Sequence, residues 1–153
     1  MRLMKSIITM AAALAAMLIL SSCGTKKDID PVDMAEALSR SIAFSETLTP
    51  LETAAAESYF MLNPNDYEEM GVYVSTKACC DEVAVIHTYS PNTVKEKLTS
   101  HISEMMEDYE VFRPSELSKL ESAVINTYKN TVVLIIAPDM DEAQAAYKEY
   151  LKK

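Results

Sequence analysis

The sequence contains only two glycines, Gly24 and Gly71, among its 153 residues. Phosphate-binding loops, dinucleotide fingerprints and the nucleophile elbow of hydrolases need clustered glycines, because the backbone must approach a ligand closely or turn sharply. None of these sites can be built here. The chain also lacks tryptophan and has no HExxH or CxxC spacing. These absences predict a protein without catalytic activity, cofactor or resident metal ion.

Basic residues are few. Lysine and arginine total 14 against 23 acidic residues, which gives a formal net charge of −9. An acidic surface disfavours nucleic acid and anionic lipid, because both repel negative charge. We therefore expect no nucleic-acid partner.

The chain has one long apolar run, residues 7–20, interrupted only by Thr9 and preceded by the basic residues Arg2 and Lys5. A transmembrane helix needs about 20 apolar residues, so this run is too short to span a bilayer. A basic start followed by a short apolar stretch is typical of a secretory signal peptide. The pattern therefore predicts an exported protein.

The end of this run carries the most specific motif, Leu20-Ser21-Ser22-Cys23. Small residues followed by cysteine resemble the lipobox of bacterial lipoproteins. In those proteins the cysteine thiol is acylated with diacylglycerol and the chain is cut just before it. Two acyl chains hold a protein stably on a membrane. We expect a signal peptide over residues 1–22, lipidation at Cys23, a tether over 23–29, and a domain over 30–153 on the outer side of the cell membrane.

Helix-start signals recur along the expected domain. They occur at Asp30 with Pro31, at Thr49 to Glu52 as a capping box, at Ser90 with Pro91, and at Asp139 with Glu142. They predict helices over about residues 31–44, 50–60 and 91–110 and from 139 onward, with a short helical turn after Pro114. This is three to four main helices.

Two pairs of β-rich segments lie between these helices, over residues 72–78 with 82–89 and 123–128 with 131–137. Lys129 and Asn130 form a two-residue gap that suits a tight hairpin turn. Residues 132–136 are apolar on both faces, which predicts a central strand covered on both sides. The fold class we expect is α+β: one domain with an antiparallel sheet of two hairpins, about four strands, packed with helices.

Cys79 and Cys80 are the weak redox candidates of the sequence. A disulfide between adjacent cysteines is strained, because their Cα atoms lie about 3.8 Å apart, and strained disulfides are labile. Such a pair could also bind copper or zinc. The alternative is that both are small residues flanking a turn. His87 and His101 read as ordinary packed or surface histidines.

Several segments of the middle and end of the chain resemble a known family. These are Phe44-Ser45-Glu46, Leu48, Tyr59, residues 72–75, residues 81–86, Tyr109, Phe112, Pro114 and residues 132–135. The family is a bacterial lipoprotein family called domain of unknown function 4358, and the resemblance covers roughly residues 32–150. It implies no assigned activity, cofactor or catalytic residue. It also implies small residues such as alanine or threonine at the positions of Cys79 and Cys80.

Two classes of function remain open. The first is a non-catalytic module, held on the membrane by its lipid, that binds an envelope protein or a small ligand. The second is a thiol-redox or metal-binding protein that uses Cys79 and Cys80. A substrate-binding lipoprotein of a transporter is a weaker third, because such proteins usually have two lobes and this chain has one.

Overall fold

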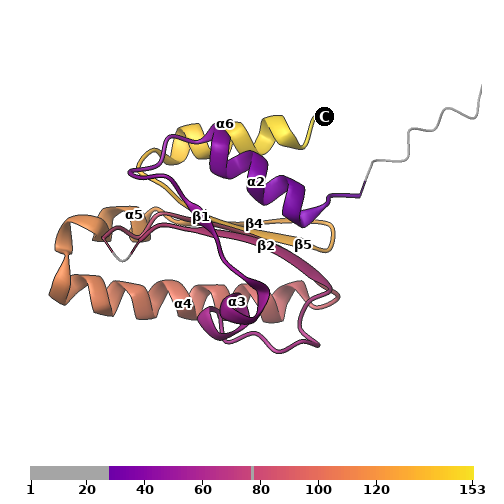
Figure 1. The fold of residues 1–153 in the computed structure, drawn as a ribbon, viewed down its shortest axis with the longest axis horizontal. Helices are drawn as coiled ribbons and strands as arrows, with labels where there is room; N and C mark the ends of the chain where they lie inside the picture. Colours follow the sequence, from indigo (N-terminus) through magenta and orange to yellow (C-terminus); the bar gives the residue numbers. More distant parts are fainter. Residues whose placement is uncertain (1–27, 77) are drawn as a thin grey trace, which may run out of the picture.

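A five-stranded antiparallel sheet lies between two layers of helices in the computed structural model, which describes residues 28–76 and 78–153 (Figure 1). The expected signal peptide and Cys23 lie outside these residues. One face of the sheet carries α2 (Pro31–Ser41) and α6 (Met140–Tyr150), and the other carries α3 (Thr53–Tyr59) and α4 (Pro91–Phe112). The α+β class predicted from the sequence is therefore confirmed.

The five strands follow the order β1-β2-β3-β5-β4, and every neighbouring pair is antiparallel. They are β1 (Thr49–Pro50), β2 (Glu69–Val74), β3 (Glu82–His87), β4 (Val124–Tyr128) and β5 (Thr131–Ile136). Every residue of β5 is buried, as the double-sided apolar pattern predicts. The predicted hairpin turn at Lys129 and Asn130 is also confirmed, with Lys129 at a φ of 52°.

Alternating side chains of the central strands build two cores. Val83 and Val85 pack with α2 and α6, whereas Ala84 and Ile86 pack with α3 and α4. Leu134, fully buried, belongs to the second of these clusters. Both clusters consist of residues from the described part of the chain. Because these residues alone form an apolar core on each face of the sheet, we expect a chain that begins at Asp28 to fold by itself.

The predicted start of the second helix at Thr49 is wrong. Thr49 and Pro50 instead form the edge strand β1, and α3 begins at Thr53 after Glu52, whose side chain makes no capping bond. Pro50 tolerates an edge position because its missing N–H would have faced outward. The Leu51 N–H donates to the Val72 carbonyl at 2.9 Å and continues the pairing. This is why the sheet has five strands where the sequence predicts about four.

Other boundaries differ by a few residues. The helix α2 ends at Ser41 and not near Phe44, and α4 continues to Phe112, past Glu110. Strand β2 covers 69–74 where the sequence predicts 72–78, because the connection to β3 begins at Ser75. Ser90 makes no side-chain cap for α4, although Asp30 and Asp139 both cap their helices as predicted. A five-residue helix, α5 (Leu117–Glu121), follows a 3₁₀ turn at Pro114–Glu116.

Gly71 allows α2 to cross β2 at close range. A Cβ atom at this position would lie 2.7 Å from the Pro31 carbonyl oxygen and 2.8 Å from the Ala35 Cβ. Any larger residue would push α2 away from the sheet. The single glycine of the domain is therefore explained by packing.

In the described part of the chain, no helix is both long enough and apolar enough to cross a membrane.

Candidate functional site

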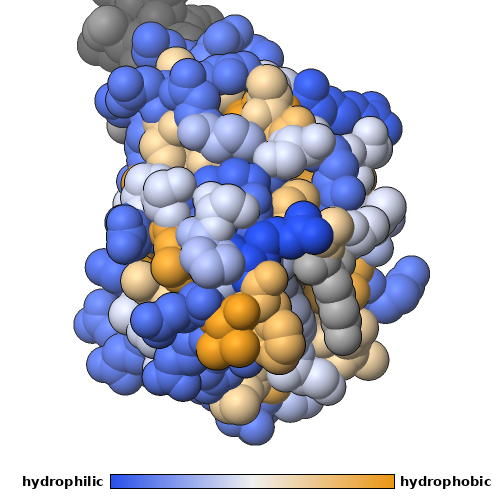
Figure 2. Space-filling model, turned by 90° about the vertical axis from the view of Figure 1, so that its left-hand side faces the viewer, coloured by the Kyte–Doolittle hydropathy of each residue, from blue (hydrophilic) through white to orange (hydrophobic). Residues whose placement is uncertain are grey.

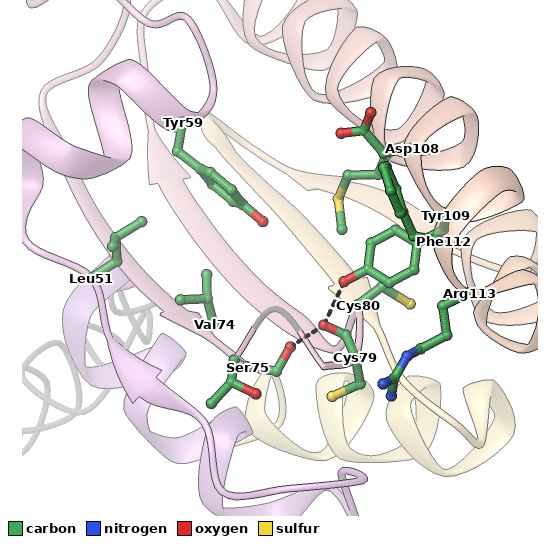
Figure 3. A pocket seen from close by; sticks show the side chains of 12 residues that line it. Leu51, Tyr59, Val74, Ser75, Cys79, Cys80, Asp108, Tyr109, Phe112 and Arg113 are labelled. Carbon is green, nitrogen blue, oxygen red and sulfur yellow. Dashed lines mark hydrogen bonds between the residues drawn. The ribbon is translucent and has the colours of Figure 1, made fainter.

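One end of the molecule carries a groove with a volume of about 670 Å³. Its walls come from the β1–α3 connection, the C-terminal end of α3, the end of β2, the β2–β3 connection and the C-terminal half of α4 (Figure 3). Most of its lining is apolar or aromatic. The lining residues are Leu51, Tyr59, Val74, Ser75, Thr76, Cys79, Cys80, Met105, Asp108, Tyr109, Phe112 and Arg113.

The groove opens where hydrophobic side chains reach the surface. Figure 2 views this end of the molecule and shows hydrophobic side chains among mostly hydrophilic ones. Phe112 is 82% exposed and lines the groove, whereas Val111 is 74% exposed and does not line it. Exposed apolar side chains beside a groove are typical of a binding site.

The β2–β3 connection is held by hydrogen bonds that converge on Cys79. The Ser75 hydroxyl and the Tyr109 hydroxyl both donate to the Cys79 carbonyl oxygen at 2.8 Å (Figure 3). The Cys79 N–H donates to the Thr76 carbonyl at 3.2 Å, and the Arg113 guanidinium donates to the Ala78 carbonyl. The connection is thus attached to α4, and the groove between them has a defined shape.

Cys79 and Cys80 are both free thiols, and both are buried. Burial raises the pKa of the Cys79 thiol above its ordinary value. Two hydrogen bonds lower this pKa, and the nearby charges of Asp81 and Glu46 raise it. Burial and then the charge of Glu116 raise the pKa of the Cys80 thiol to about 12. Because the thiolate is the nucleophile and the metal ligand, these thiols are poorly suited to either role at neutral pH.

Beside the cysteines lies a buried group of charges. Lys119, on α5, donates at 2.8 Å to Asp81 Oδ1 and at 2.8 Å to Glu116 Oε2. Asp81 also accepts from the Ser45 N–H at 2.6 Å, and Glu116 accepts from the Cys80 N–H at 3.1 Å. Asp81 is fully buried. We refer to Asp81, Glu116 and Lys119 as the ion triad.

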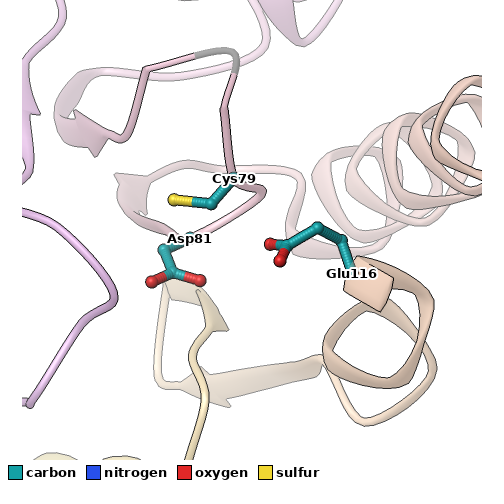
Figure 4. Close-up of side chains that lie close together, drawn as sticks. All are labelled: Cys79, Asp81 and Glu116. Atoms are coloured by element: carbon teal, nitrogen blue, oxygen red, sulfur yellow. The ribbon is translucent and has the colours of Figure 1, made fainter. Parts of the chain in front are cut away.

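Two members of the ion triad, Asp81 and Glu116, lie close enough to Cys79 to test the hypothesis that the cysteines bind a metal ion. Ligand atoms of Cys79, Asp81 and Glu116 all lie within 4.8 Å of one another, a spacing suited to one ion (Figure 4). The Lys119 ammonium, however, already binds both carboxylates. Burial alone would lower the pKa of Lys119, but its hydrogen bonds to Asp81 and Glu116 raise it above the ordinary value. A metal ion would have to displace this charged ammonium, so the cluster fits an ion pair better than a metal ligand set.

A second buried acid, Glu82, was missed by the sequence reasoning. Glu82 is 1% exposed, and its Oε2 atom accepts from the Tyr59 hydroxyl at 3.0 Å and lies 3.3 Å from His101 Nε2. Its other oxygen, Oε1, is buried and has no hydrogen-bond partner among the described residues. His101 is packed between Tyr59 and Phe60, with ring centroids 4.5 and 4.8 Å away. His87 is half-buried and bonds Thr131 and Glu68.

Replacing both thiols, Cys79→Ala with Cys80→Ala, is expected to change the free energy of unfolding by only about 1 kcal/mol. The reason is that the connection is held through the Cys79 carbonyl and the backbone N–H groups, which alanine retains. Urea denaturation of the two proteins measures the difference. Loss of folding, or sub-micromolar zinc or copper binding that disappears in the variant, would contradict this assignment and favour the thiol or metal alternative.

The fold and the groove define a class: a small α+β domain that has a partly apolar groove. The model of a protein family, the Domain of unknown function (DUF4358), matches residues 40–137, more than half of the chain, so the protein belongs to that family. The matched residues include β1 to β5 and every described residue of the groove lining. Comparison with curated proteins and with solved structures finds no match to the chain.

Proposed function

We propose that the protein is an exported lipoprotein, anchored through Cys23, whose domain binds a small ligand with an apolar body without transforming it. The groove is the observation that supports this proposal most strongly. Its volume of about 670 Å³ lies within the usual range of ligand sites, and its lining is mainly apolar and aromatic with a few polar groups.

The state of the two thiols supports binding over catalysis. Cys79 and Cys80 are the nucleophile candidates in the groove, and both have a raised pKa. A nucleophilic mechanism needs a neighbouring base that activates the thiol. Burial and the neighbouring carboxylates raise both pKa values. These effects outweigh the hydrogen bonds that lower the pKa of Cys79 and the Lys119 charge that lowers the pKa of Cys80.

The position of Asp28 suggests how the groove is presented. Asp28 lies 3.2 Å from Lys129 Nζ, in the β4–β5 turn, whereas the groove lies at the other end of the strands, beyond Glu82 and Val74. Five residues from Cys23 to Asp28 reach at most about 18 Å. With the lipid at Cys23, the Asp28 end of the domain is held close to the membrane, and the groove opens on the far side, toward ligands that diffuse in from outside.

Phe112→Ala is expected to weaken binding of the fluorescent apolar probe N-phenyl-1-naphthylamine about fivefold, since Phe112 contributes apolar contact area at the groove. Fluorescence titration of the chain from Asp28 to Lys153 measures the dissociation constant. The matched control is Val111→Ala, because Val111 is a similarly exposed neighbour outside the groove lining. It is expected to change the constant less than twofold.

Equal effects of the two substitutions would contradict the assignment of the groove as the binding site. Absence of probe binding to the wild type would overturn the proposed function itself.

A further inference from the structure

We propose that the groove selects an organic ammonium ion, a small amine with an apolar body and N–H donors. This inference rests on the proposed function and names its class of ligand. It follows from the hydrogen-bonding state of the groove hydroxyls and from an acid buried behind them.

Three hydroxyl groups in the groove have already used their only hydrogen. Tyr109 and Ser75 each donate to the Cys79 carbonyl oxygen, and Tyr59 donates to Glu82 Oε2. A hydroxyl has one hydrogen and two lone pairs, so each of these oxygens presents only lone pairs to a ligand. The groove wall therefore accepts hydrogen bonds at three points. The fourth lining hydroxyl, Thr76, accepts from the Ala78 N–H and keeps its hydrogen, so acceptors outnumber hydroxyl donors and favour a ligand that donates.

The Glu82 side chain lies behind one of these acceptors, Tyr59. It is the cross-strand partner of Val74, which lines the groove, and its side chain lies on the same face of the sheet as Val74 and Cys80. Its Oε2 bonds the Tyr59 hydroxyl, which polarises the phenol oxygen and makes it a stronger acceptor. The Oε1 atom, buried and without a donor among the described residues, leaves this acid short of hydrogen bonds. A ligand N–H that donates to the Tyr59 oxygen would meet the strongest of the three acceptors.

The remaining groups of the groove fit an ammonium ion as well. The aromatic rings of Tyr59, Tyr109 and Phe112 line the same groove, and ring faces attract cations. The Asp108 carboxylate lies at the exposed side of the lining. Among the described lining residues, Arg113 is the one cation, and its guanidinium is exposed and donates to the Ala78 carbonyl rather than to the three acceptor oxygens.

The test compares three probes that share one apolar body and differ in charge: 2-phenylethylammonium, 2-phenylethanol and 3-phenylpropanoate. The chain from Asp28 to Lys153 is titrated with each, and backbone amide shifts of Ser75 and Cys79 report binding in the groove. We expect the ammonium to bind about tenfold more tightly than the alcohol and more tightly still than the carboxylate.

Two variants locate the selectivity. Tyr59→Phe, which removes the polarised oxygen, and Asp108→Asn are each expected to weaken ammonium binding about threefold to tenfold and alcohol binding by a smaller factor, because the alcohol donates a neutral hydrogen bond. The matched control is Glu107→Gln, which removes one negative charge from an exposed position of α4 outside the groove lining. Thermal melting verifies that each variant is folded, and Asp108→Asn, at an exposed site, keeps the test valid if Tyr59→Phe is unstable.

The outcomes separate the two proposals. Ammonium preference that falls in Tyr59→Phe and Asp108→Asn but not in Glu107→Gln supports the inference. If the carboxylate or the alcohol binds as tightly as the ammonium or more tightly, the inference is overturned and the binding function stays intact. The same holds if Glu107→Gln weakens ammonium binding as much as Tyr59→Phe and Asp108→Asn do, because net charge alone would then attract the probe. If no probe shifts the groove amides, the proposed function fails together with the inference.

Discussion

Lys119→Met is expected to destabilise the domain by about 3–5 kcal/mol, because it leaves the buried Asp81 carboxylate and the partly buried Glu116 carboxylate without their cation. Lys119 is 13% exposed and is shared by Asp81 and Glu116 at 2.8 Å each. A loss of this size is a large part of the total stability of a small domain, which is about 5–15 kcal/mol. Urea denaturation with far-UV circular dichroism measures the free energy of unfolding.

The chain offers a matched control for this substitution. Lys129→Met removes a lysine from an ion pair with Asp28 in which both side chains are largely exposed. Exposed pairs contribute about 0–1 kcal/mol, so this variant is expected to remain close to the wild type. Combining Lys119→Met with Asp81→Asn and Glu116→Gln removes the unpaired charges and is expected to recover part of the lost stability. A Lys119→Met protein as stable as Lys129→Met would refute the role of the ion triad.

The ion triad also predicts a pH dependence with a definite sign. Burial raises the pKa of Glu116, but hydrogen bonds from Lys119 and the Cys80 N–H lower it below the ordinary value of 4.5 overall. A lowered pKa in the folded state gives stability that is present above about pH 4.5 and is lost as the pH falls. The raised pKa of Lys119 gives stability that is present below about pH 10.5 and is lost as the pH rises through the folded-state value. The stability difference between wild type and Lys119→Met should therefore narrow below about pH 4.5.

The strands and long helices could be predicted because their signals are local. Asp30 and Asp139 precede their helices as acidic caps, and the uninterrupted apolar run of β5 reports a strand covered on both faces. Edge strand β1 could not be predicted, because its two residues, Thr49 and Pro50, also have the pattern of a helix start. Their pairing with β2 depends on contacts with residues more than 20 positions away.

The candidate site could be predicted only in part, for the same reason. Cys79 and Cys80 are visible in the sequence as an unusual pair, and they do line the groove. Glu82 looks like an ordinary residue at the start of a strand. Its burial depends on Tyr59 of α3 and His101 of α4, which lie 23 positions before it and 19 positions after it. One signal could have indicated a buried acid: Glu82 is a charged residue in the mainly apolar strand β3, and the alternation of side chains along the strand places it on a face that packs against helices.

Cys23→Ala is expected to abolish membrane anchoring of the mature protein. The prediction rests on the small residues Ser21 and Ser22 before Cys23, at the end of an apolar run of signal-peptide length. Acyl chains contribute about 0.8 kcal/mol of membrane affinity for each buried methylene, so removing both chains removes the force that holds the domain. The variant should either appear in the soluble fraction or retain residues 1–22 uncleaved.

Detergent phase partitioning and mass spectrometry of the N-terminal peptide decide this prediction together. The wild type should enter the detergent phase and carry a diacylglyceryl mass on Cys23, and the variant should lack that mass. The matched control is the Cys79→Ala, Cys80→Ala protein, which removes the other two cysteines of the chain and should partition like the wild type because both thiols lie inside the domain. The lipid anchor would be disproved if the wild type carried no acyl mass and the Cys23→Ala protein were cleaved and still entered the detergent phase. That result would also disprove the proposal that the groove is held facing away from a membrane.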